Sequence, residues 1–119
     1  KMEKQLEGLI HSALDLTKEA VVEMVREKIK IGEEQRRIRG QIVSEYYILT
    51  GRFPDISLDN YIGNAVSEWR EIHQKYGEKA GYKCVTLKLE EAKTKFTLEP
   101  AVVDYLDKKI EEFREKVKT

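Results

Sequence analysis

The chain has 119 residues, with 22 basic and 22 acidic side chains and a formal net charge of zero. This length fits a single domain with its own hydrophobic core. The even balance of charge excludes a strongly basic nucleic-acid coat and an acidic disordered tail. Cys84 is the only cysteine, so the chain has no internal disulfide and nothing points to an oxidising compartment.

Targeting signals are missing from the sequence. It has no apolar run of about 18 residues that would cross a membrane, and residues 1–7 lack the apolar core of a signal peptide. We therefore expect a cytoplasmic protein with no membrane partner. The many charged residues, beside only two Asn and four Gln, give a composition typical of thermophiles.

The first predicted element is a long amphipathic helix over residues 3–31, where apolar residues recur at steps of three and four. Such a helix usually packs against another helix along its whole length, as in a coiled coil. Together with the last helix of the chain, it predicts self-association as a homodimer. The residues expected in this contact are Leu6, Leu9, Ala13, Leu16, Ala20, Leu106, Ile110 and Phe113. Alternatively, the two end helices cover each other within one chain.

Gly32 predicts a break or kink before a second helix that ends at Gly51, a plausible C′ residue. The alternative is one continuous helix in which Gly32 costs about 1 kcal/mol relative to Ala. The core-facing residues of the second helix would be Ile38, Ile42, Val43, Tyr46 and Leu49.

A third helix follows the loop at residues 52–56. Ser57 suits its N-cap, and Ile56 with Tyr61 fits a hydrophobic staple. The helix is expected to end near Gly77 or Gly81. Its apolar stripe consists of Leu58, Tyr61, Ile62, Ala65, Val66, Trp69, Ile72 and Tyr76.

Residues 82–89 alternate between apolar and polar side chains, which predicts a strand, and residues 94–98 are its expected hairpin partner. Thr97 then caps a last helix with Pro100 in its first turn. The stripe of this helix is Val102, Leu106, Ile110, Phe113 and Val117.

These elements predict a mainly α fold of the α+β class, with three N-terminal helices, a short β-hairpin and a C-terminal amphipathic helix. The single domain, residues 1–119, would comprise a helical arm or hairpin (3–50), a helix with a β-hairpin (57–98) and the last helix (98–118). The helix at residues 56–69 and the lysine-bearing hairpin up to Pro100 resemble winged-helix DNA-binding proteins with helical dimerisation arms. This resemblance implies that the hairpin is a wing.

Basic residues outnumber acidic ones in two stretches, by seven to four over residues 26–52 and by five to three over residues 78–95. Contacts with phosphates need such a local excess of positive charge. The expected nucleic-acid-binding residues are Arg36, Arg37, Arg39, Arg52, Lys83, Lys88, Lys93 and Lys95. A solvated, ion-paired helix surface is the more common explanation of such a pattern.

Catalytic and metal motifs are weak in this chain. Asp55 with Glu91 and Lys93 has the residue types of a metal-dependent nuclease, and residues Glu7, His11 and Asp15 share one helix face, but both patterns are expected by chance. We therefore expect no catalytic residues, no metal and no cofactor.

Aromatic residues offer a further kind of contact, because they can stack on bases or anchor a partner. Trp69, Tyr61 and Tyr76 are expected in the core, and Tyr47 is the best candidate for an exposed ring. The sequence thus supports two functions equally. One is a non-catalytic nucleic-acid-binding homodimer, most plausibly DNA-binding, and the other is a helical scaffold or assembly module that binds a protein partner.

Overall fold

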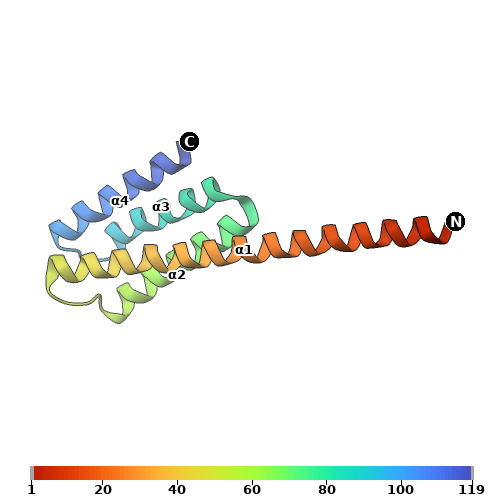
Figure 1. The fold of residues 1–119 in the computed structure, drawn as a ribbon. Coiled ribbons are helices and arrows are strands. Elements are labelled where there is room, and N and C mark those ends of the chain that lie inside the picture. Colours follow the sequence, from red (N-terminus) through yellow and green to blue (C-terminus); the bar gives the residue numbers. More distant parts are fainter. Residues whose placement is uncertain (1, 119) are drawn as a thin grey trace. The chain divides into compact units, whose positions relative to one another are not determined.

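The computed structural model describes the backbone of residues 2–118 and the side chains of residues 17–118. It contains four helices: α1 (Met2–Thr50), α2 (Ile56–Tyr76), α3 (Glu78–Lys95) and α4 (Pro100–Lys118) (Figure 1). Residues 2–118 contain no strand, so this part of the chain is all-α, and the predicted α+β class is wrong.

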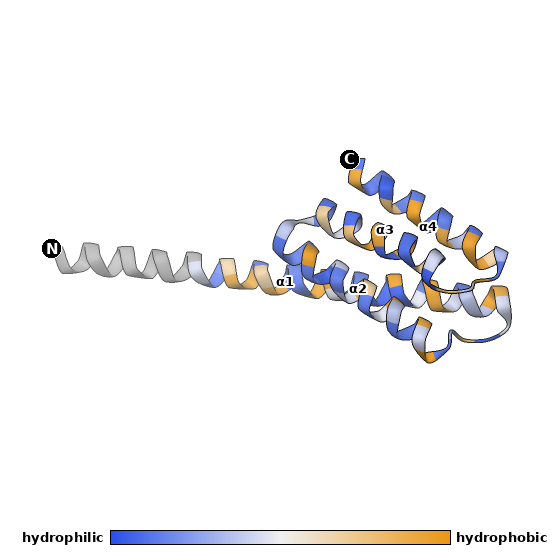
Figure 2. Ribbon diagram, turned by 180° about the vertical axis from the view of Figure 1, so that it is seen from behind, coloured by the Kyte–Doolittle hydropathy of each residue, from blue (hydrophilic) through white to orange (hydrophobic). Residues whose placement is uncertain are grey.

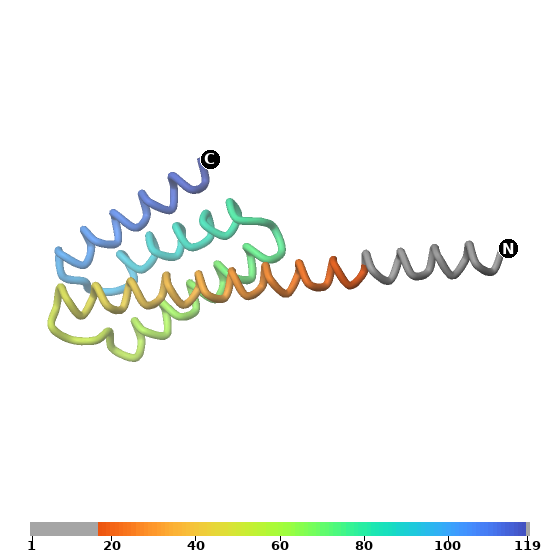
Figure 3. The backbone as a smooth tube through the Cα atoms, viewed as in Figure 1, coloured from red at the N-terminus to blue at the C-terminus, as the bar shows by residue number. Residues whose placement is uncertain are grey.

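Contacts divide the chain into two units, Lys1–Lys30 and Ile31–Thr119. The first unit is the N-terminal part of α1. The second contains the rest of α1 together with α2, α3 and α4. Short connections lead from α2 to α3 and from α3 to α4, and each of these consecutive pairs packs together (Figure 3).

Gly32 lies inside α1, so the predicted break is wrong and the alternative of one continuous helix is confirmed. The residue is buried, and a Cβ at this position would lie 3.8 Å from the guanidinium carbon of Arg70. Arg70 in turn donates a hydrogen bond from Nη1 to Gln35 Oε1 at 2.9 Å. Arg70 therefore packs over Gly32 with enough room for a methyl group. Gly51 ends the helix with a φ of 76°, as predicted.

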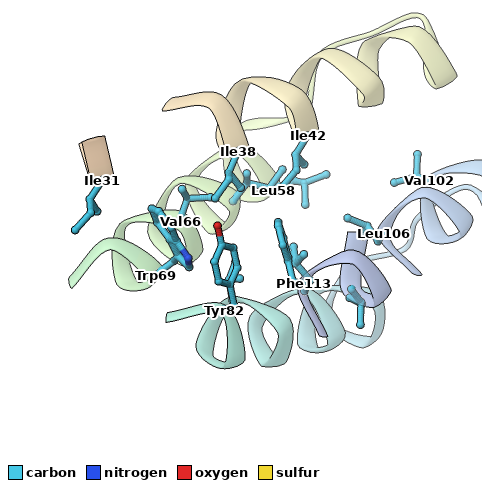
Figure 4. Packing of buried hydrophobic residues seen from close by; sticks show 14 residues of the cluster. Ile31, Ile38, Ile42, Leu58, Val66, Trp69, Tyr82, Val102, Leu106 and Phe113 are labelled. Carbon is cyan, nitrogen blue, oxygen red and sulfur yellow. The ribbon is translucent and has the colours of Figure 1, made fainter. Parts of the chain in front are cut away.

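The core of the second unit takes apolar side chains from all four helices. Ile38 and Ile42 of α1 point toward Trp69 of α2, Tyr82 of α3 and Phe113 of α4 (Figure 4). The ring centres of Trp69 and Tyr82 are 5.6 Å apart, and those of Tyr82 and Phe113 are 5.3 Å apart. The predicted stripe of the last helix is confirmed, because Val102, Leu106, Ile110 and Phe113 are buried and Val117 packs against them.

The predicted stripe of α2 is confirmed over Leu58, Ile62, Ala65, Val66 and Trp69, but the predicted start of this helix is wrong. Asp55 is the N-cap, and its Oδ1 accepts a hydrogen bond from the Leu58 amide at 2.9 Å. Ile56 therefore lies in the first turn, 80% exposed, and forms no staple. Tyr76 is also exposed, contrary to the prediction that it is buried.

The predicted β-hairpin is replaced by α3, so the winged-helix resemblance is wrong. Val85 and Leu89 are buried, whereas Leu87 between them is 67% exposed. Leu87 therefore does not share the buried face of Val85 and Leu89, as it would in a strand. The buried positions recur at helical steps of three and four: Tyr82, Val85, Thr86, Leu89 and Ala92.

Gly77 separates α2 from α3 with a φ of 100°, which confirms the predicted helix end. One turn later, a Cβ on Gly81 would lie 3.0 Å from His73 Cβ and 3.1 Å from the Trp69 carbonyl oxygen. Glycine thus lets the two helices approach closely where their hairpin begins. The last helix starts at Pro100, where Glu99 rather than Thr97 accepts the first backbone hydrogen bonds.

Candidate interaction surfaces

The first unit carries an exposed apolar face on α1, which we call the α1 apolar face. It consists of Ala20, Val21, Val22, Met24, Val25 and Ile29. The five large side chains in this set are between 46% and 59% exposed. In Figure 2 this stretch is the hydrophobic, orange part of α1 that follows its grey end. Isolated apolar residues are common on protein surfaces, but a contiguous exposed set usually marks an interaction site.

Charged residues of both signs lie within and around the α1 apolar face. Arg26 forms an ion pair with Glu23 at 3.2 Å, and both side chains are exposed. Lys18, Glu19, Glu27 and Lys28 are also exposed, and the side chains at residues 17–118 include no ion-pair partner for any of the four. The segment thus carries two lysines and two glutamates that are open to partners.

The residues predicted for self-association fall into three groups. Leu6, Leu9, Ala13 and Leu16 lie outside the residues whose side chains the structure describes. Ala20 is exposed on α1. By contrast, Leu106, Ile110 and Phe113 lie in the core of the second unit, where the chain's own side chains cover them.

Six of the eight basic residues predicted to bind nucleic acid are engaged with neighbours in the second unit. The ion pairs are Arg37–Glu34 (2.6 Å), Arg39–Asp59 (3.3 Å), Arg52–Glu99, Lys88–Glu68 (3.4 Å) and Lys93–Asp107 (2.5 Å), and Lys95 lies 5.2 Å from the Tyr61 ring centre. Within the described residues, Arg36 and Lys83 are exposed and have no such partner. Nucleic-acid binding stays a prediction.

A cleft of about 600 Å³ opens between α1 and α4 within the second unit. Its most deeply buried charge is Lys109, whose Nζ donates to Gln41 Oε1 at 2.8 Å and to Glu112 Oε2 at 3.2 Å. Burial, with smaller effects of Glu45 and Glu112, raises the pKa of Tyr105 in this cleft to about 12. The two lysines and two glutamates in the lining balance each other, so the cleft has no net charge to select an ion. The lining residues are Gly40, Gln41, Ser44, Glu45, Tyr105, Lys108, Lys109 and Glu112.

Two of the three candidate nuclease residues have structural roles of their own. Asp55 caps α2, and Lys93 pairs with Asp107 and with Glu90. Over the described side chains, no group of three His, Cys, Asp or Glu residues is placed to hold a metal ion. The other metal pattern, Glu7, His11 and Asp15, falls on side chains outside the description.

Tyr47 is exposed, as predicted, and stacks on Phe53 with ring centres 4.6 Å apart. Ile48 at the end of α1 and Ile56 at the start of α2 are 71% and 80% exposed, so four large apolar side chains near the α1–α2 connection are exposed. The sequence did not single out these residues as a group. Ile48 lies outside the predicted core stripe, as Tyr47 does, whereas Ile56 was expected to be covered in a staple with Tyr61.

Within the described part of the chain, no helix combines the length and the apolar character that a membrane span requires. No protein-family model matches this chain, and neither the curated proteins nor the solved structures contain a significant match to it.

Proposed function

We propose that this protein is a helical assembly module, in which the N-terminal part of α1 joins copies of the same chain. The observation that carries the proposal is the α1 apolar face, with five large apolar side chains roughly half exposed. Most helical stability in proteins comes from packing an amphipathic face rather than from propensity. A partner helix would supply that packing.

Charge favours a second copy as the partner. Lys18 and Lys28 on one copy can pair with Glu19 and Glu27 on another, since all four are exposed and form no ion pair with the described residues. The formal net charge of the chain is zero, so copies do not repel each other as a strongly charged protein would. Basic or acidic partners would match only half of these side chains.

The test is the mass of the full chain in solution, measured by light scattering at micromolar concentrations. We expect a mass above that of one chain, and a double variant, Val21→Gln with Val25→Gln, that is shifted toward one chain. The matched control, Glu23→Gln with Arg26→Gln, removes an exposed ion pair on the polar side of the same helix without altering net charge, and it should keep most of the association. A wild-type protein that stays a single chain up to about 100 µM, a concentration at which even weak contacts form, would overturn the proposal.

A further inference from the structure

The α1 apolar face is broader than one partner helix can cover. Each residue turns an α-helix by about 100°. Going around α1 from Ala20, the order is therefore Met24, Val21, Val25, Ile29 and Val22, and the whole set spans about 200° of the circumference. All six residues are exposed.

A two-helix seam needs a much narrower stripe. In a two-stranded coiled coil only two positions of every seven face the partner, and even a core-facing helix in a globular protein needs an apolar width of little more than about 100°. Ala20 with Met24 and Val22 with Ile29 lie on opposite flanks of the arc. One neighbouring helix that covers either flank leaves the other in water.

We propose that the N-terminal part of α1 packs with two neighbouring copies at once, so that the assembly is a bundle of three or four chains. This inference rests on the proposed function and adds the number of copies to it. In such a bundle each helix buries both flanks, one against each neighbour. The polar side, with Glu19, Glu23, Arg26, Glu27 and Lys30, then faces solvent.

Two lysines lie within the arc, at different distances from its flanks. Lys28 falls between Met24 and Val21, and Lys18 falls between Val25 and Ile29. A lysine can lay its aliphatic stem along an apolar surface and extend its ammonium group to the rim. Lys18, beside the flank of Ile29 and Val22, can reach Glu27 at the edge of the next helix, as e and g residues do in coiled coils. Lys28 lies near the middle of the arc and would face the bundle axis, where a single polar residue lowers stability but fixes the register of the helices.

Sedimentation equilibrium and native mass spectrometry of the full chain count the copies directly. Three or four chains support the inference. Exactly two chains would leave the proposed function standing and overturn the broader bundle, whereas one chain would overturn both.

A flank variant tests which residues set the number. Val22→Gln with Ile29→Gln narrows the arc to the residues from Ala20 to Val25, about 140°. We expect fewer copies than in the wild type, while the control Glu23→Gln with Arg26→Gln keeps the wild-type number. An unchanged number in the flank variant would contradict the assignment of this flank to a second neighbour. Far-UV circular dichroism during thermal unfolding checks that the second unit is folded in every variant.

Discussion

Two glycines show how the space around a residue decides whether a Gly→Ala substitution raises or lowers the free energy of unfolding. Gly81 and Gly40 both lie inside helices, but a Cβ on Gly81 would meet His73 and the Trp69 carbonyl oxygen at 3.0–3.1 Å, whereas a Cβ on Gly40 meets nothing within 4 Å. We expect Gly81→Ala to lower the free energy of unfolding by about 1–3 kcal/mol, because α2 and α3 must move apart. Gly40→Ala should raise it by about 0.5–1 kcal/mol, because alanine favours the helix. Urea denaturation measures both, and equal effects of the two variants would contradict this account.

The buried hydroxyl of Tyr82 should make the free energy of unfolding depend on pH. Burial, with smaller effects of Glu34 and Glu78, raises its pKa from 10.0 to about 12. Below pH 10 both the folded and the unfolded chain keep this proton, so stability does not depend on the group. Between pH 10 and 12 the unfolded chain loses the proton while the folded chain keeps it, so the free energy of unfolding falls as pH rises.

Tyr82→Phe should therefore flatten the fall in stability across that pH window, as measured by urea denaturation at several pH values. Some dependence remains, because burial also raises the pKa of Tyr61 and of Tyr105 to about 12. The control Val85→Ala also perturbs the core but adds or removes no proton, so it should keep the wild-type slope. A Tyr82→Phe slope as steep as that of the control would refute the role of this hydroxyl.

At the scale of the helices, Asp55 and Ser57 are the two candidates for the N-cap of α2. Asp55 accepts the hydrogen bond from the Leu58 amide, and Ser57 lies within the first turn of the helix. We expect Asp55→Ala to cost about 1 kcal/mol of stability, and Ser57→Ala to change it by less than about 0.5 kcal/mol. Thermal unfolding of the two variants gives the comparison, and a larger loss for Ser57→Ala would assign the cap to the serine.

The helices also show which sequence patterns are decisive. The stripes of α2 and α4 were predictable because their apolar residues fit a helical period and no other. The pattern of α3 was ambiguous, since Val85, Leu87 and Leu89 alternate as in a strand. Its true buried face includes Thr86 and Ala92, which are weak markers of a core. The run from Glu90 to Lys93, rich in helix formers and free of turn residues, was the signal that favoured a helix.

The candidate site was predictable only in part. Residues 20–29 were recognisable as apolar positions of a helix, but a sequence pattern does not reveal whether the chain itself covers them. The same limit applies to Leu106, Ile110 and Phe113, which have the same kind of stripe and yet lie in the core. Ion pairing is equally invisible in one sequence, because Arg39 with Asp59 and Lys93 with Asp107 are brought together only by the packing of helices.

At the scale of the whole molecule, folding and association should be separable. Every buried apolar side chain among residues 17–118 lies between Ile31 and Phe113, within the second unit. A shortened chain that begins at Lys28, one turn before Ile31, keeps this entire core. We expect it to unfold in one cooperative transition, with a free energy of unfolding within about 1 kcal/mol of the full chain at low concentration, since every side chain from residue 17 to residue 27 is exposed.

The same shortened chain should remain a single chain by light scattering, because it lacks nearly all of the α1 apolar face. Its melting temperature should not change with concentration, whereas association adds concentration dependence to any full-length transition that is coupled to it. A shortened chain that still associates would assign the contact to another surface, such as the one that carries the exposed residues Tyr47, Ile48 and Phe53. A shortened chain that fails to fold would show that residues upstream of Lys28 contribute to the core, and the division into a folding unit and an assembly helix would be wrong.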